Sequence, residues 1–145
     1  MAQPTTSTAL IHRHLVFGWA SLLFFIAWGL GLEALHAFKS ESYLGVEQEV
    51  RRLMWTLGHA HGVGLSLLHM GFVATVRAAE LPPSARLSTV SRLLCWATLL
   101  LPGGFLGGGI VTYEGDPGLL ILLAPIGALT LLFAVVQMLL SLRRS

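Results

Sequence analysis

Four long apolar stretches constrain this chain more than any other feature of its sequence. They run over about residues 15–37, 53–76, 93–111 and 119–142, with short polar segments between them. An apolar run of about 18 residues or more can cross the hydrocarbon core of a bilayer as an α-helix. A segment in lipid must also satisfy its backbone hydrogen bonds internally, which a helix does. The sequence therefore predicts an all-α integral membrane protein, folded as an antiparallel four-helix bundle.

The composition supports this class. Hydrophobic residues make up 54% of the chain and charged residues 11%, and the mean hydropathy is +0.75, whereas about a quarter of a soluble domain is charged. We expect a polar amino-terminal segment over residues 1–14 and a single transmembrane domain over 15–145. The first apolar run exceeds the core of a signal peptide, about 7–15 residues, so we expect it to be retained. The net charge of +2 does not favour a nucleic-acid partner.

The basic residues predict an orientation. With four spans, one side of the membrane carries both termini and the second loop, and the other side carries the first and third loops. The first side holds six lysine and arginine residues and the second holds three; these are Arg13, Arg77, Arg86, Arg92, Arg143 and Arg144 against Lys39, Arg51 and Arg52. Cytoplasmic loops carry the excess of positive charge. We therefore expect a multi-pass protein of the inner (cytoplasmic) membrane with both termini in the cytoplasm.

Polar residues near the outer ends of the first two spans are the candidate site. At 1.5 Å per residue, His59 lies about 9 Å and His61 about 12 Å below the outer surface. Glu33 and His36 end the first span on that same side. Ionisable groups inside a membrane are costly and usually functional. The four side chains are therefore expected to share one layer in the outer leaflet.

This layer has the residue types of a metal or haem site. Glu33 and His36 form a Glu-x-x-His pair, the arrangement found in carboxylate-bridged di-metal bundles. Imidazole with carboxylate suits zinc, iron or manganese, and paired imidazoles suit a haem. We predict Glu33, His36, His59 and His61 as metal ligands, with the three histidines also as haem ligands. Because residues two apart point to opposed sides of a helix, only one of His59 and His61 faces this pair.

Two other functions fit the same residues. The polar layer can satisfy its own hydrogen bonds in a non-enzymatic structural or assembly subunit. Alternatively, the short loops and intramembrane prolines are compatible with a transporter of protons or small solutes.

The remaining polar residues of the spans receive plainer interpretations. His14 is expected at headgroup level beside Arg13, and the single cysteine, Cys95, is expected to be a small apolar residue rather than a metal ligand.

Small-xxx-small patterns let helices approach closely in lipid. We expect Gly58 and Gly62 to face the glycines of the third span. The competing interpretation is that Pro102 and the glycine run break that span. The patterns of the third span pair Gly103 with Gly107 and Gly104 with Gly108.

Residues 52–72, RLMWTLGHAHGVGLSLLHMGF, resemble the histidine-bearing second helix of small four-span bacterial membrane proteins, which are distantly similar to haem-copper oxidase subunit I. The resemblance implies that His59 or His61 is an axial haem ligand. No histidine follows His69, so His36 or another subunit would supply the second ligand. The resemblance also implies a redox accessory role in the lipid bilayer, with other membrane subunits or further copies of the chain as partners.

Overall fold

The computed structural model describes residues 6–143, and four long helices dominate them. The long helices are α1 (Thr6–Ala37), α3 (Glu49–Ala78), α4 (Ala85–Gly108) and α5 (Leu123–Leu142). The fold is therefore all-α, as predicted. Residues 1–5 of the expected polar segment, and Arg144, lie outside the described residues. Residues 6–14 form the first turns of α1 rather than a separate segment.

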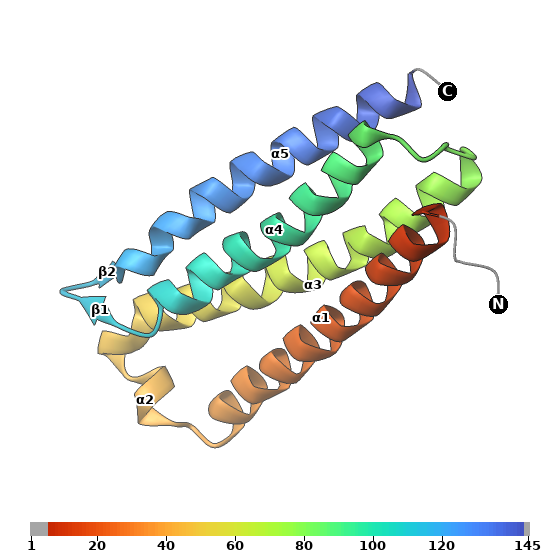
Figure 1. Cartoon of the computed structure of the whole chain (residues 1–145). Helices are drawn as coiled ribbons and strands as arrows, with labels where there is room; N and C mark the ends of the chain where they lie inside the picture. The colour runs from red at the N-terminus through yellow and green to blue at the C-terminus, as the bar shows by residue number, and fades with distance from the viewer. Residues whose placement is uncertain (1–5, 144–145) are drawn as a thin grey trace.

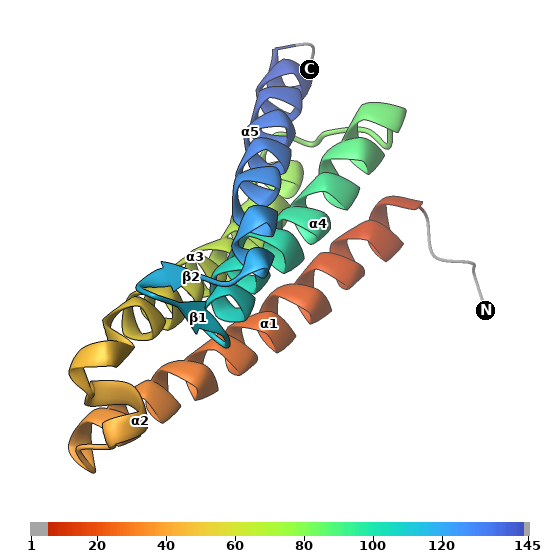
Figure 2. The same ribbon diagram turned by 90° about the vertical axis from the view of Figure 1, so that its left-hand side faces the viewer.

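The long helices pack in chain order. The principal contacts join α1 to α3, α3 to α4, and α4 to α5, and Figures 1 and 2 show α1 and α5 on opposite sides of this row. Each long helix runs against its predecessor, so the start of α1, the end of α5 and the 79–84 connection lie at one end of the molecule. This arrangement places α3 and α4 in the middle, each with two helical neighbours.

Three of these helices are long and apolar enough to cross a membrane. They span Thr8–Ala37, Ala85–Gly108 and Leu119–Leu142. The helix α3 falls short because His59, His61 and His69 lower its hydropathy, although it runs alongside α1 and α4 (Figure 1). Large apolar side chains point outward from the edge helices; Leu23 of α1 is 70% exposed and Leu129 of α5 is 66% exposed. Such side chains carry no penalty in contact with lipid tails.

The glycines bring helices together, but not in the expected pairs. Gly58 faces Leu106 of α4, whereas Gly62 faces the Phe25 ring of α1. Gly104 faces the backbone of α5 at Ala124. The expected pairing of the α3 and α4 glycines is therefore wrong, because these residues lie on different faces of their helices. Gly104 of α4 thus serves the contact with α5, and Gly107 and Gly108 face the 3₁₀ turn (Leu119–Leu122) that precedes α5.

The third span is one continuous helix. Pro102 lies inside α4 and is buried, and helical hydrogen bonding continues to Gly108. The observed second loop is also shorter than the segment between the expected spans, residues 77–92, because α4 already begins at Ala85. Its start is capped by Ser84, whose side chain accepts a hydrogen bond from the Leu87 amide at 3.1 Å, as a serine N-cap does.

At the far end of the molecule, the start of α3 holds the connections in place. A short helix, α2 (Glu41–Leu44), and a 3₁₀ turn (Val46–Gln48) lead into α3. Arg51 donates to the carbonyl oxygens of Gly109 and Ser42, at 3.1 and 3.2 Å. Arg52 donates to the Tyr43 carbonyl at 3.2 Å. These guanidinium groups satisfy carbonyls that the ends of helices leave without partners.

The glycine- and proline-containing residues 112–118 predict a tight turn between the last two spans, and the connection between α4 and α5 confirms it as a tight hairpin. Strand β1 (Thr112–Tyr113) pairs antiparallel with β2 (Asp116–Pro117). The two turn residues, Glu114 and Gly115, have φ values of 48° and 91°. Positive φ at both central residues is the geometry of the turns that best match the twist of a hairpin.

Candidate functional site

Two buried histidines and one half-buried cysteine lie together where three helices meet. His14 comes from α1, His69 from α3 and Cys95 from α4, and one ligand atom of each lies within 4.8 Å of the others. His14 is 0% and His69 1% exposed. Within residues 6–143, these three form the one group of three or more histidine, cysteine, aspartate or glutamate side chains that converges in this way. We call them the His–His–Cys centre.

The two imidazole rings face each other, and each also reaches a hydroxyl of α4. Their Nδ1 atoms are 2.6 Å apart. The Nε2 of His14 lies 2.7 Å from Ser91 Oγ, and that of His69 lies 3.0 Å from Thr98 Oγ1. All four ring nitrogens therefore have a partner, as buried polar atoms require.

The hydroxyl of Thr98 fixes where the protons sit. It donates its single proton to the Leu94 carbonyl at 2.9 Å, so it accepts from His69 at the 3.0 Å contact. Neutral His69 then carries its proton on Nε2, and its Nδ1 presents a lone pair. That lone pair accepts the hydrogen bond that His14 donates from Nδ1. The two rings are consequently in opposite tautomers.

The tautomer of His14 sets the direction of its hydrogen bond to Ser91. Because the proton of His14 is on Nδ1, its Nε2 accepts the hydrogen bond from the Ser91 hydroxyl. The guanidinium of Arg13, an exposed residue, in turn donates to Ser91 Oγ. His14 is therefore not an exposed interfacial side chain: it points inward and anchors a polar network among three helices. Arg13 stays exposed, but its guanidinium reaches this network at Ser91.

Close packing of α1 on α3 makes this network possible. A methyl group at Gly18 would lie 2.9 Å from His69 Cβ and 3.3 Å from the Ser66 carbonyl oxygen. Only glycine lets the two backbones approach this closely without a shift of the helices. One helical turn away along α1 and α3, the Ser66 and Ser21 hydroxyl oxygens lie 2.9 Å apart across the same interface.

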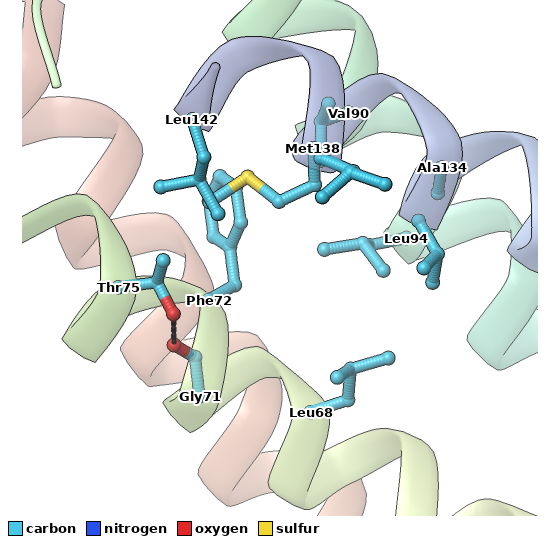
Figure 3. Close-up of a pocket in the computed structure, with 11 residues that line it drawn as sticks. Leu68, Gly71, Phe72, Thr75, Val90, Leu94, Ala134, Met138 and Leu142 are labelled. Atoms are coloured by element: carbon cyan, nitrogen blue, oxygen red, sulfur yellow. Dashed lines mark hydrogen bonds between the residues drawn. The ribbon is translucent and has the colours of Figure 1, made fainter. Parts of the chain in front are cut away.

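Two aromatic rings wall the centre. The Phe17 ring meets His69 edge-on at 4.9 Å between centroids, and the Phe72 ring lies 4.5 Å from His14. Phe72 also lines an apolar groove of about 340 Å³ between α3, α4 and α5. Figure 3 shows this groove, with Leu68 and Met138 on its walls. Phe72 therefore stands between the groove and His14.

The donor set of the centre fits a transition-metal ion. An ion would be held by Nδ1 of His14, Nδ1 of His69 and Sγ of Cys95, and thiolate and imidazole are the ligands that zinc and copper prefer. Metal-bound histidines usually donate their other N–H to an oxygen, a role for which Ser91 and Thr98 are placed. Ligands sharing an ion at about 2.0–2.1 Å each lie roughly 3.3–3.6 Å apart, so the rings must separate by roughly 1 Å.

Three of the predicted outer ligands share a groove at the opposite end. Glu33, His36 and His59 line a groove of about 340 Å³ between α1 and α3, with Tyr43 of α2 at its edge. His59 donates from Nδ1 to the Phe25 carbonyl at 2.8 Å, and His36 does so to Leu32 at 3.2 Å. These side chains share the groove, but the described residues show no convergence of their ligand atoms like that of the centre.

His61 lies apart from the other three. It donates from Nδ1 to the Leu57 carbonyl at 2.8 Å and stacks on the Phe105 ring of α4 at 4.9 Å. This agrees with the expectation that only one of His59 and His61 faces the first helix. Haem ligation by His59 or His61 stays a prediction.

The sequence argument missed the centre. His14 and Cys95 are not part of any local sequence motif, and the sequence predicts Cys95 to be a small apolar residue. The distance of each residue from the nearest end of its span could have revealed the centre. His14 follows the start of the first span, His69 precedes the end of the second, and Cys95 follows the start of the third. All three thus lie toward the same end of the molecule.

The chain is an all-α protein with three helices that are long and apolar enough to cross a membrane, and with a His–His–Cys centre whose two histidines are buried. Comparison with protein-family models, curated proteins and solved structures finds no match.

Proposed function

We propose that this chain is a small multi-pass membrane protein that binds a transition-metal ion at the His–His–Cys centre. The observation that carries the proposal is the convergence of His14, His69 and Cys95 from three helices, with both histidines buried. The Nε2 atoms of both histidines are hydrogen-bonded to hydroxyl oxygens. Their Nδ1 atoms are therefore oriented toward each other and toward a shared ligand.

In this proposal α3 also crosses the membrane, as the fourth span of a helical bundle. It runs between α1 and α4 over their length (Figure 1), and its buried side chains include His69 and Ser66. The excess of basic residues places both termini in the cytoplasm. His14 lies about 9 Å along α1 from Thr8, the start of the first candidate span. The centre therefore lies in the cytoplasmic half of an inner membrane.

One observation favours a structural role instead. The network of His14, His69, Ser91 and Thr98 is complete without an ion. In that case it fixes the register of α1, α3 and α4 in a non-enzymatic structural or assembly subunit. This role explains the two histidines, but it assigns nothing to Cys95.

Elemental analysis tests the metal proposal. We expect purified protein loaded with a mixture of first-row transition-metal ions, and then desalted, to retain about one equivalent. Cys95→Ala and His69→Ala should lose it. His12→Ala and His61→Ala should keep it, because these histidines lie outside the centre.

Thermal unfolding in detergent separates the two roles. A ligand at about 100 times its Kd stabilises a folded protein by about 2.7 kcal/mol. The retained ion should therefore raise the melting temperature of the wild type and leave that of Cys95→Ala unchanged. If no ion is retained while His14→Ala alone lowers the melting temperature, the metal proposal is wrong and the structural role stands.

A further inference from the structure

The geometry points to monovalent copper as the ion that the His–His–Cys centre selects. This inference rests on the proposed function and narrows it from a metal site to a Cu⁺ site. Three properties of the centre carry it: the number of ligands, the charge of the filled site and the seal around it.

The number of ligands is three. The described residues add no fourth histidine, cysteine, aspartate or glutamate to the group. A structural zinc site takes four protein ligands, and a three-ligand zinc site keeps an open position for water. Cu⁺ prefers soft thiolate donors and, because of its single charge, is satisfied by three ligands. The donor set therefore matches Cu⁺ without an added ligand.

The charge of the filled site also favours a monovalent ion. Two neutral imidazoles and one thiolate carry a charge of −1, so Cu⁺ gives a neutral site and Zn²⁺ leaves a net positive charge. Net charge inside a membrane is costly. The Arg13 guanidinium, which donates to Ser91 beside His14, adds a cation next to the centre and raises that cost for a divalent ion.

The seal around the two histidines of the centre also disfavours zinc. His14 and Ser91 are 0% exposed, and His69 and Thr98 are 1% and 3% exposed. The Phe17 and Phe72 rings cover the histidines. A water or hydroxide ligand that would complete a zinc site therefore has no route past the two histidines, and the half-buried Cys95 is the one ligand with exposed surface.

Binding is a ligand exchange without oxidation or reduction. The Sγ–H bond of Cys95 breaks, its proton leaves to solvent, and a Cu–S bond forms. The proton of His14 moves from Nδ1 to Nε2, where the hydrogen bond to Ser91 reverses its direction, and both Nδ1 lone pairs then bind copper. Each Cu⁺ therefore releases one proton.

The test is competition for each ion against a coloured chelator, under anaerobic conditions and in detergent. Cu⁺ is supplied as its bicinchoninate complex and Zn²⁺ as a complex with a chromophoric zinc chelator. We expect wild-type protein to withdraw one equivalent of Cu⁺ and to bind Zn²⁺ about 100-fold or more weakly. Cys95→Ala, a small change in volume, should lose Cu⁺ binding, and His12→Ala should retain it.

Each outcome gives a distinct result. If Zn²⁺ binds at one equivalent as tightly as Cu⁺ or more tightly, the copper inference is overturned and the metal site stands. If neither ion binds to the wild type, the proposed function fails as well. Because both decisions rest on the wild-type chain, they do not depend on how well any variant folds. Proton release of about one per Cu⁺ in weakly buffered solution would give independent support.

Discussion

Adjacent glycines of α4 offer a matched test of how the helices are held together. A methyl group at Gly104 would lie 3.0 Å from the Ala124 Cα and 3.0 Å from the Leu123 carbonyl carbon, and closer still to the Ala124 amide nitrogen. These are backbone atoms of the α5 segment, so they cannot rotate away. A methyl group at Gly103 would have no atom within 4 Å. The two positions share a helix but not a neighbour.

The expected magnitudes follow from two opposed effects. Replacing a helical glycine by alanine gains about 0.5–1 kcal/mol, because the unfolded chain loses freedom. This gain is common to both variants. Overpacking a tight contact costs about 1–3 kcal/mol, and it applies only to Gly104→Ala. Gly103→Ala should therefore be slightly more stable than the wild type, and Gly104→Ala less stable than Gly103→Ala by about 1–3 kcal/mol.

Unfolding in mixed detergent, followed by circular dichroism as denaturing detergent is titrated in, measures this difference. Equal stability of the two variants would refute the close approach of α4 and α5. A loss of stability in Gly103→Ala would refute the assignment of that face to open space or lipid.

Two further predictions concern topology and the centre. A phosphatase that is active only outside the cytoplasm should be inactive when fused after Ser145 and active when inserted at Gly115 in the hairpin; activity after Ser145 would overturn the proposed orientation. Thr98→Val should weaken metal binding about 10–100-fold, because His69 loses the oxygen that accepts its Nε2 proton. Thr89→Val is the control: this half-buried threonine of the same helix donates to the Ala85 carbonyl and lies outside the centre, and unchanged affinity in Thr98→Val would show that the hydroxyl does not orient His69.

The helices were predictable because their signal is local. Each apolar run appears in the sequence as one continuous stretch, and the end of α1 at Ala37 and the Thr112–Pro117 turn followed from local residue patterns. Helix starts were less predictable. α1 begins at Thr6 and α4 at Ala85, because polar residues before a span can extend a helix beyond its apolar core.

The centre was not predictable in the same way because its members are far apart in the chain. His14 and His69 are 55 positions apart and bond through Nδ1. Which face of α1 meets α3 depends on Gly18 and Gly62, and the sequence does not state which helix each glycine will face. By contrast, the partial gathering of Glu33, His36 and His59 in one groove was accessible, since it required only that two helices end on the same side.

The order of the helices along the chain has a consequence for biogenesis. The centre draws its residues from α1, α3 and α4, and α5 contributes none. During synthesis, folding proceeds from the amino-terminal side, so under the proposed function the three ligands are in place while α5 is still being made. An ion captured at that stage would hold the first three long helices together before their last neighbour arrives.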